Sequence, residues 1–442
     1  MFIRYVAEHL RAPNWTAAGL ALGIMFASAL AVAETPRIDG ARLNQTMARM
    51  KTFGGNADGG SDRIAFSLHN KAALEYLAGL MVEAGLETRI DVAGNLIGSR
   101  AGADARLAPL IAGSHIDTVI NGGHYDGVVG VMAAIEAART LNDAGYRLRH
   151  PLEIVVWSNE EAGKTGSRSF AGTVQERELA LTALGEATIG DGIAFLGGDP
   201  ERLSENMRSP GDVAGYVELH VEQGAVLDQA GLEIGVVTGI VGIRRWNVVI
   251  EGFANHAGTT PMAQRQDALY AAAQFVTAAR RVITASPGAQ VGTVGRIVAE
   301  PGAPNVIPGR VTLSLEIRDL SMDKIDRLFA QIEAEAHDIA AATDTRFAIE
   351  QYYESPAAAS DPRIAALVDQ AAHDLGLSRR PMPSGAGHDA QSFKDIAPLG
   401  MIFIPSRDGI SHAPGEYSAP DDIANGANVL LQVLIGMDGE LD

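Results

Sequence analysis

The first half of the chain alternates short apolar strands with amphipathic helices, and this alternation limits the folds that it can adopt. Helical apolar periods cover residues 65–84 and 128–144, and a glycine follows each of them. Apolar runs of strand length cover residues 109–113 and 152–157. The pattern predicts βαβ units and therefore an α/β domain, in which helices cover a mostly parallel sheet. Ligands bind such sheets beyond the C-terminal ends of the strands.

The middle of the chain has a different order of elements. The expected elements are a strand at 243–252, a helix at 265–285, strands at 290–299 and 310–318, a helix at 323–342 and a strand at 347–353. This β-α-β-β-α-β order predicts a ferredoxin-like α+β domain. Segments rich in small residues, which predict hinges, flank it at 237–242 and 354–362, and the α/β pattern resumes after them. The expected division is a signal peptide at 1–33, a large α/β domain at 34–240 and 355–442, and an inserted domain at 241–354.

The N-terminal segment has the features of a secretory signal peptide. Arg4 and Arg11 precede an apolar run at 16–33, which ends in the small residues Ala31-Val32-Ala33. The pattern predicts cleavage after Ala33 and a mature protein that works in a periplasm or outside the cell. The apolar run is also just long enough to span a bilayer, so an uncleaved membrane anchor is the alternative.

Charge and cysteine content narrow the possible partners and chemistry. The formal net charge is −19, whereas nucleic acids and anionic membranes are bound by basic surfaces. We therefore expect a small-molecule partner, no nucleic acid, and no membrane contact beyond the signal segment. The chain has no cysteine, which excludes disulfides, thiolate catalysis and thiolate metal ligands. Any metal must be held by His, Asp and Glu.

Ionisable residues gather in short polar stretches beside the expected strands. The first stretch, GSHIDTVINGGHYDG at 113–127, carries His115, Asp117 and Asp126. On an extended segment His115 and Asp117 share a face, so Asp117 can orient the imidazole of a metal ligand. Asp126 precedes an expected helix, and it therefore suits a helix N-cap as well as a metal site.

The second stretch, WSNEEAGKTGSRSFAG at 157–172, carries the adjacent carboxylates Glu160 and Glu161. Neighbouring carboxylates repel each other unless positive charge neutralises them. A metal would do so, with one carboxylate as ligand and the other as general base. A solvated strand end is the alternative. Two further stretches, VELHVEQG at 217–224 and RDGISHAPGE at 407–416, place His220 and His412 in a similar setting.

Nine motifs follow one another in the order found in the M20 metallopeptidase-like amidohydrolases. They are GSHIDT, GGHYDG, NEEAG, ELHVEQG, NHAGTTPM, PNVIPG, EIRD, GAGHDA and SHAPGE. From about Arg42 to the C-terminus, the chain most resembles the hydantoinase/carbamoylase branch, which includes N-carbamoyl-L-amino acid hydrolases, β-ureidopropionases and allantoate amidohydrolases. The resemblance implies a catalytic domain with two metal ions, an inserted lid and dimerisation domain, and a homodimer.

The resemblance also implies roles for particular residues. One metal would be held by His115, Asp126 and His220, and the other by Asp126, Glu161 and His412, with Asp126 bridging the pair. Glu160 would be the general base, and Asp117 would support His115. The implied substrate-binding residues are Gln223, His256, Asn305, Arg318 and His388.

Within this set, His256 and Asn305 would stabilise the developing oxyanion, with His256 serving the partner subunit's site. Arg318 would bind a substrate carboxylate with its bidentate fork. For Arg318 the alternative is an ion pair with Glu316 or Asp319, and for His256 it is a role in the turn that follows.

The expected reaction is hydrolysis of a linear amide or ureido C–N bond in a carboxylate-bearing substrate, most often an N-carbamoyl-L-amino acid or a related ureide. A hydroxide shared by two divalent metals would attack, and Glu160 would transfer the proton. Zinc or manganese is expected, while cobalt or nickel also suits these ligands. The alternatives are an M20 aminoacylase or dipeptidase and a non-catalytic periplasmic ligand-binding protein.

Overall fold

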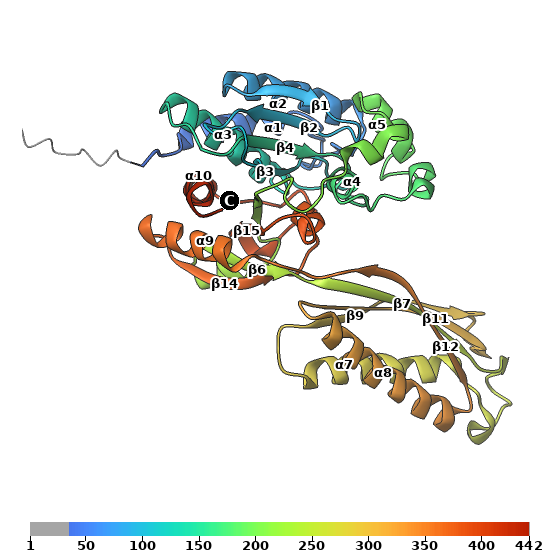
Figure 1. Cartoon of the computed structure of the whole chain (residues 1–442). Coiled ribbons are helices and arrows are strands. Elements are labelled where there is room, and N and C mark those ends of the chain that lie inside the picture. The colour runs from blue at the N-terminus through green and yellow to red at the C-terminus, as the bar shows by residue number, and fades with distance from the viewer. Residues whose placement is uncertain (1–34, 442) are drawn as a thin grey trace, which may run out of the picture. The chain divides into compact units, whose positions relative to one another are not determined.

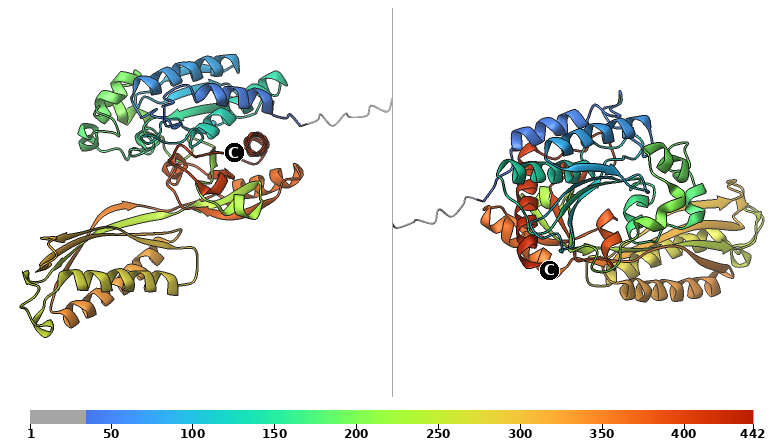
Figure 2. Two further views of the ribbon diagram at one scale, coloured as in Figure 1. Left: turned by 180° about the vertical axis from the view of Figure 1, so that it is seen from behind. Right: turned by 45° about the horizontal axis from the view of Figure 1, so that its top comes forward.

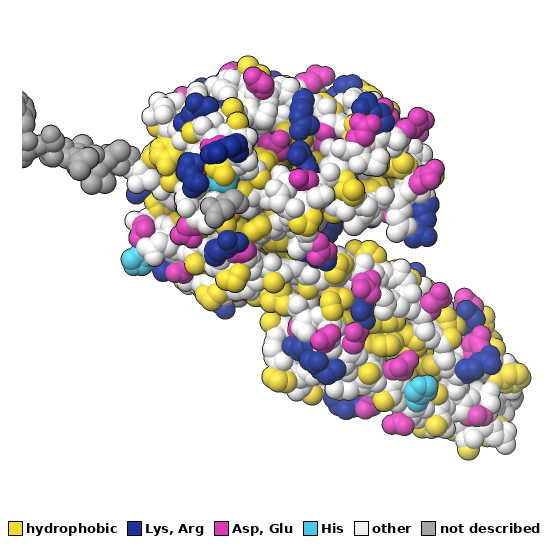
Figure 3. Space-filling model, in the orientation of Figure 1, with side chains coloured by type: hydrophobic (Ala, Val, Ile, Leu, Met, Phe, Trp, Pro, Cys, Tyr) yellow, Lys and Arg dark blue, Asp and Glu magenta, His cyan; other side chains and the backbone are white. Residues whose placement is uncertain are grey.

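The computed structural model describes residues 35–441, and all the elements discussed below belong to the compact unit Pro36–Asp442. The predicted signal segment and its cleavage site lie outside the described residues. Within residues 35–441, no helix combines the length and the apolar character that a membrane span requires. On the face shown in Figure 3, acidic and basic side chains are interspersed over the surface.

A nine-stranded mixed sheet forms the centre of the larger α/β region (Figure 1). The strand order is β1-β2-β4-β3-β5-β15-β6-β13, and β14 pairs with β6. The four neighbouring strands β4, β3, β5 and β15 are parallel, whereas β1, β2, β6 and β13 make antiparallel pairs. The predicted α/β class with a mostly parallel central sheet is confirmed. The strands are β1 (Glu87–Ile90), β2 (Leu96–Arg100), β3 (Leu110–His115), β4 (Leu152–Trp157), β5 (Gly215–Val221), β6 (Ile234–Ile240), β13 (Ala358–Ala359), β14 (Arg379–Ser384) and β15 (Leu399–Ile404).

Side chains of the central strands alternate between two hydrophobic cores. In β4, Ile154 and Val156 pack into the core beneath the long helices, while Val155 and Trp157 pack into the core on the opposite face. Both faces of the sheet are thus covered (Figure 2), as a parallel sheet requires. The long helices are α1 (Gly40–Met50), α2 (Leu68–Glu83), α3 (Val128–Asp143), α9 (Pro362–Asp374) and α10 (Pro420–Glu440). Shorter elements are α4 (Thr165–Phe170), α5 (Ile189–Leu196), α6 (Val226–Ala230) and the 3-10 helices η1 (Glu176–Ala180), η2 (Pro200–Asn206), η4 (Asp389–Phe393) and η5 (Arg407–Gly409).

Residues 242–355, called the insertion below, form a second, four-stranded antiparallel sheet in the order β12-β7-β11-β9. The helices α7 and α8 lie together against this sheet and share a separate hydrophobic core with it (Figure 1). Its elements are β7 (Gly242–Glu251), β8 (Asn255–His256), η3 (Met262–Gln264), α7 (Ala268–Ala285), β9 (Val291–Glu300), β10 (Val306–Ile307), β11 (Arg310–Asp319), α8 (Met322–Thr343) and β12 (Arg346–Ser355). The long elements follow the predicted β-α-β-β-α-β order. The domain boundaries and the lid and dimerisation roles stay predictions.

The chain passes between the two sheets at two crossover points. Val241 separates β6 from β7, and Pro356 with Ala357 separates β12 from β13. The crossovers lie side by side, because Ala358 pairs with Ile240 in the large sheet. Both fall within the segments that the sequence predicts as hinges.

Candidate metal centre

The C-terminal ends of the four parallel strands bring the predicted metal ligands together. His115 is the last residue of β3, and His220 is the last but one of β5. Glu160 and Glu161 come from the turn after β4, and His412 comes from the loop after β15. Because neighbouring parallel strands end at the same edge of a sheet, residues far apart in the sequence meet there.

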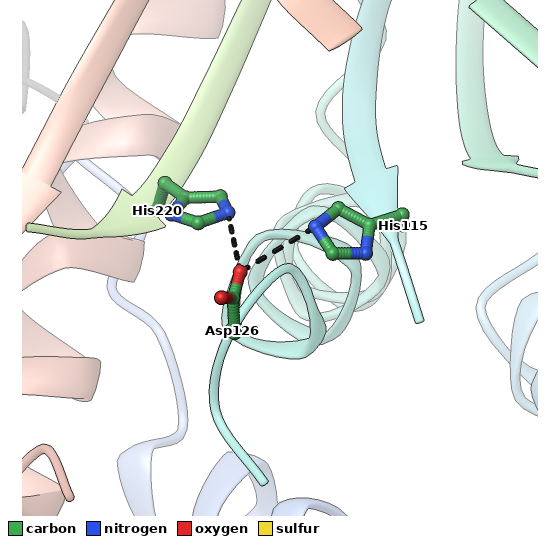
Figure 4. A group of neighbouring side chains, drawn as sticks. All are labelled: His115, Asp126 and His220. Atoms are coloured by element: carbon green, nitrogen blue, oxygen red, sulfur yellow. Dashed lines mark ion pairs between the residues drawn. The ribbon is translucent and has the colours of Figure 1, made fainter. Parts of the chain in front are cut away.

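Asp126 lies at the middle of the cluster, with its two carboxylate oxygens facing different histidines. Oδ1 is 3.1 Å from Nε2 of His220 and 3.5 Å from Nε2 of His115, and Figure 4 shows both rings pointing at this oxygen. Oδ2 is 3.1 Å from Nε2 of His412, which is also 3.6 Å from Oε2 of Glu161. The carboxylate therefore has the geometry of a group that is shared between two cation positions.

Two triads of possible metal ligands result, and they share Asp126. In each triad the ligand atoms lie within 4.8 Å of one another: His115, Asp126 and His220 form the first, and Asp126, Glu161 and His412 form the second. These triads are the two ligand sets that the sequence resemblance implies. The structure brings the residues together, and their assignment as ligands stays a prediction.

A third group, Glu218 with His220 and His388, also lies within ligand distance. Its carboxylate is already hydrogen bonded, because Oε1 accepts from Ser114 Oγ at 2.7 Å and Oε2 accepts from the backbone N–H of Ala390 at 3.0 Å. We therefore favour the two triads around Asp126 as the cation positions.

Backbone carbonyl groups orient the imidazoles of the first triad. His115 Nδ1 lies 3.0 Å from the carbonyl oxygen of Asp117, and His220 Nδ1 lies 2.9 Å from that of Val221. If each Nδ1–H donates to its carbonyl, each Nε2 has a lone pair that can bind a cation, although Nε2 of His220 here accepts the backbone N–H of Gly127 at 3.2 Å. This arrangement fits a metal site, in which neutral histidines bind through a fixed nitrogen.

Asp117 supports the site in a way that differs from the prediction. Its carboxylate oxygen is 3.7 Å from His115 Nδ1, so the backbone carbonyl makes the closer contact with the ring. The carboxylate instead accepts the backbone N–H groups of Glu160 at 3.2 Å and Glu161 at 3.1 Å. Asp117 thus holds the turn that carries the two glutamates.

Crowding of buried acids shifts the pKa values of the cluster. Burial alone would raise the pKa of Asp126, but hydrogen bonds with three imidazoles outweigh burial and hold its pKa well below the usual range. Burial, with Asp126 and Glu160 nearby, raises the pKa of Glu161 to about 8. The hydrogen bond to Asp126 raises the pKa of His412 to about 9, against the effect of burial. The imidazoles can be neutral and the carboxylates ionised at the same time when bound cations supply the positive charge that protons otherwise provide. This donor set therefore fits two divalent metals.

Metal affinity is expected to rise between pH 6 and pH 9. His412 and Glu161 must lose their protons to act as ligands, and below pKa values of about 9 and about 8 protons compete with the metal. The affinity should therefore increase with pH, by up to about tenfold per pH unit for each proton displaced. Competition titrations against a coloured chelator at several pH values would measure this change. An affinity that does not vary over this pH range would contradict the assignment.

The Glu160–Glu161 turn is largely shielded from solvent and is strained, unlike a solvated strand end. The side chains of Glu160 and Glu161 are 11% and 7% exposed. Asn159, which precedes them, has a φ of 54°, a conformation that costs free energy in a non-glycine residue. Glu160 Oε2 lies 4.0 Å from Nε2 of His115, and burial raises the pKa of Glu160. A carboxylate in this position can reach groups held by the first triad.

Two of the predicted substrate residues lie beside the cluster. Gln223 donates from Nε2 to Asp126 Oδ2 at 2.7 Å and lies 3.3 Å from His412 Nε2. The His388 ring packs edge-to-face on His220, with the ring centroids 4.4 Å apart, and its Nε2 is 2.7 Å from Ser384 Oγ. Burial and the neighbouring His220 hold the pKa of His388 well below its usual value, so it is neutral.

His256 and Asn305 lie together in the insertion, where β8 pairs with β10. The backbone N–H of Ala257 donates to the carbonyl of Asn305 at 3.0 Å, and His256 Nδ1 accepts the backbone N–H of Gly258 at 3.0 Å. Within residues 35–441, neither side chain contacts the metal cluster. His256 is hydrogen bonded within the turn that follows it, as the alternative interpretation expected. Its role at the active site stays a prediction.

Arg318, at the end of β11, forms an ion pair with Glu316, which was the predicted alternative to binding a substrate carboxylate. Its Nε donates to Glu316 Oε1 at 2.7 Å, and its Nη1 donates to the carbonyl of Gly385 at 2.8 Å. Among the described residues, Nη2 makes no hydrogen bond. Gly385 belongs to the segment that carries His388, so the contact places the guanidinium next to a predicted substrate residue.

Several residues that support the site were not predicted. Glu416 Oε1 accepts the backbone N–H groups of Tyr125 at 2.8 Å and Asp126 at 3.0 Å, which fixes the central carboxylate. Glu416 lies in the same SHAPGE motif as His412, so the motif could have drawn attention to it. Arg63 is fully buried and donates from Nε to the carbonyl of Ile116 at 2.6 Å. No local pattern in the sequence marks Arg63.

Comparison with known proteins identifies the family. The sequence profile of Peptidase family M20/M25/M40 matches residues 111–435. The chain belongs to this family. Among M20 relatives, the N-carbamoyl-L-amino acid amidohydrolase of Geobacillus stearothermophilus is 39% identical over 402 residues, which cover 89% of this chain and 97% of that protein. The allantoate amidohydrolase of Bacillus subtilis is 34% identical over 397 residues, which cover 86% of this chain and 94% of that protein.

A solved M20 structure supports the same branch. The hydantoinase/carbamoylase family amidase from Burkholderia multivorans has a TM-score of 0.85 and is 34% identical, and the match covers 92% of this chain and 100% of that chain. The predicted membership in the hydantoinase/carbamoylase branch is therefore confirmed.

Proposed function

We propose that this chain hydrolyses the linear amide or ureido C–N bond of an N-carbamoyl-L-amino acid or a related ureide, with two divalent metals at the cluster around Asp126. As a member of the hydantoinase/carbamoylase branch, it is a hydrolase of C–N bonds other than peptide bonds. The observation that carries the proposal is the shared carboxylate, whose two oxygens face two separate ligand triads. Zinc or manganese is the proposed metal.

The relatives' names indicate the class of substrate. Relatives named for N-carbamoyl-L-amino acids, allantoate and ureidoglycolate match along nearly the whole chain. These compounds share a ureido group and a carboxylate. The N-carbamoyl-L-amino acid relative is 39% identical, whereas the allantoate and ureidoglycolate relatives are each 34% identical, which favours the first class.

The residues of the site would have different roles in the proposed reaction. Two divalent cations, when bound, would polarise the substrate carbonyl and lower the pKa of water. Glu160 would accept a proton from water and pass it to the leaving nitrogen. Gln223 and the neutral His388 would position the substrate, and Nη2 of Arg318 would bind its carboxylate. His256 and Asn305 would reach the oxyanion only from a different placement of the insertion or from the partner subunit.

A substrate panel tests the proposal. The metal-reconstituted protein should release ammonia from N-carbamoyl-L-amino acids, with allantoate, ureidoglycolate and dipeptides as the other members of the panel. Dipeptide cleavage without ammonia release would favour an aminoacylase or dipeptidase. Ligand binding without turnover of any member would favour a binding protein and overturn the proposal.

Three further points stay proposals of the same kind. They are cleavage of the signal peptide after Ala33, a periplasmic or secreted location, and a homodimer that brings His256 to the partner's site.

A further inference from the structure

One buried glutamine contacts both crossover points between the two sheets. Gln391 lies in η4 and is 6% exposed. Its Nε2 donates to the carbonyl of Pro356 at 2.6 Å and reaches the carbonyl of Val241 at 3.5 Å. The backbone N–H of Val241 also donates to the carbonyl of Ser384, at 3.1 Å. The side-chain amide thus holds the strands that enter and leave the insertion.

The other end of the same amide contacts the loop of the proposed general base. Gln391 Oε1 accepts a hydrogen bond from Lys164 Nζ at 2.5 Å. Lys164 has a φ of 56° at the start of α4, and its backbone N–H donates to the carbonyl of Glu160 at 2.9 Å. Glu160, Lys164, Gln391 and the crossover carbonyls therefore form one continuous chain of hydrogen bonds.

The packing around this contact leaves little freedom. Gly387 lies against it, since a Cβ added there would be 3.2 Å from Lys164 Nζ and 3.5 Å from Gln391 Oε1. A buried amide with both ends hydrogen bonded cannot shift without leaving polar groups unpaired, which is unfavourable. A displacement of the crossover carbonyls should therefore move Lys164 and the turn before it.

We propose that Gln391 and Lys164 are positioning residues, which couple the orientation of the insertion at its crossover points to the placement of Glu160. The inference rests on the proposed function for the role of Glu160, but the coupling is a property of the chain itself. The proposal predicts that contacts of the insertion with a substrate or a partner subunit change the position of Glu160 through Gln391.

The insertion contains a matched control. Lys324 Nζ donates to Gln290 Oε1 at 2.6 Å, and Gln290 Nε2 donates to the carbonyls of Ile283 at 2.8 Å and Ser286 at 2.6 Å. Gln290 is 9% exposed, so its environment resembles that of Gln391. The chemistry is the same, but every partner of Gln290 belongs to the insertion. Gln290→Met thus removes similar hydrogen bonds without touching the crossovers.

The test is amide hydrogen exchange on the metal-loaded, substrate-free protein, read by mass spectrometry. Gln391→Met should speed exchange in segments 238–246, 352–360 and 158–166, whereas Gln290→Met should leave all three unchanged at a similar loss of Tm. Faster exchange at the crossovers alone, without a change at 158–166, would overturn the coupling. So would wild-type exchange in all three segments.

Kinetics provide a second measure where a substrate is turned over. Gln391→Met should lower kcat by about ten- to a hundredfold, since a small displacement of a catalytic group has effects of this size. Lys164→Met should act through the same contact, so the double variant should be no slower than the slower single variant. Fully additive losses would contradict the proposal. If no panel substrate is hydrolysed, the proposed function fails, and hydrogen exchange still decides the coupling.

Discussion

Glutamine in place of Glu160 is expected to lower kcat by about 10²–10⁴-fold, the usual contribution of a general acid–base group. Glutamine has the size of glutamate but cannot accept a proton from water. Because Glu160 belongs to neither ligand triad, the bound metal and the thermal stability should stay close to wild type. Turnover with the preferred substrate of the panel and metal analysis of the purified variant would measure both effects.

The environment of Glu160 explains why the loss should fall on kcat. The side chain is 11% exposed and lies 4.0 Å from His115, and Asp117 fixes its backbone N–H. The matched control is Glu153→Gln on β4, where the carboxylate lies 3.7 Å from Arg89 and from Arg208. This control should keep its turnover. A Glu160→Gln protein within a few-fold of wild-type kcat would refute the base assignment.

The sequence predicted the fold well where the signal is local. The apolar runs predicted at 109–113 and 152–157 correspond closely to β3 and β4, because a strand that is buried on both faces leaves a continuous apolar run in the sequence. The pairing of β5 with β15 leaves no such pattern. Phe403 lies opposite His220 in that pair, and only packing of the whole sheet brings these distant segments together.

The candidate site, like the sheet, could be predicted from the sequence only in part. The residue pattern alone was consistent with Asp126 as a helix N-cap or as a metal ligand. The order of the nine motifs favoured the metal ligand. In the structure Gly127 occupies the N-cap of α3, with no side-chain cap hydrogen bond, so the cap interpretation is wrong. The contact between Lys164 and Gln391 joins two loops without a recognisable spacing, and sequence reasoning therefore missed it.

Asparagine in place of Asp126 is expected to abolish binding of both metals and to lower turnover by about a thousandfold or more, since metal catalysis supplies several kcal/mol of transition-state stabilisation. The asparagine amide has one oxygen and no charge, so it cannot serve two cations. His412→Ala should instead affect the second triad alone, because His412 lies beside Oδ2 of Asp126 and Oε2 of Glu161, whereas the histidines of the first triad face Oδ1. Metal analysis after dialysis should therefore give different stoichiometries for the two variants.

A matched control for this substitution lies at the C-terminal end of α3, the helix that follows Asp126. Asp143 is the last residue of α3, its side chain is 55% exposed, and it pairs with Arg42 at 3.1 Å. Asp143→Asn should keep both metals and full turnover. If Asp126→Asn also kept two metals per chain, the shared carboxylate would not be the bridge. Each triad would then hold its cation without the carboxylate that both share, and the assignment of Asp126 as the common ligand would fail.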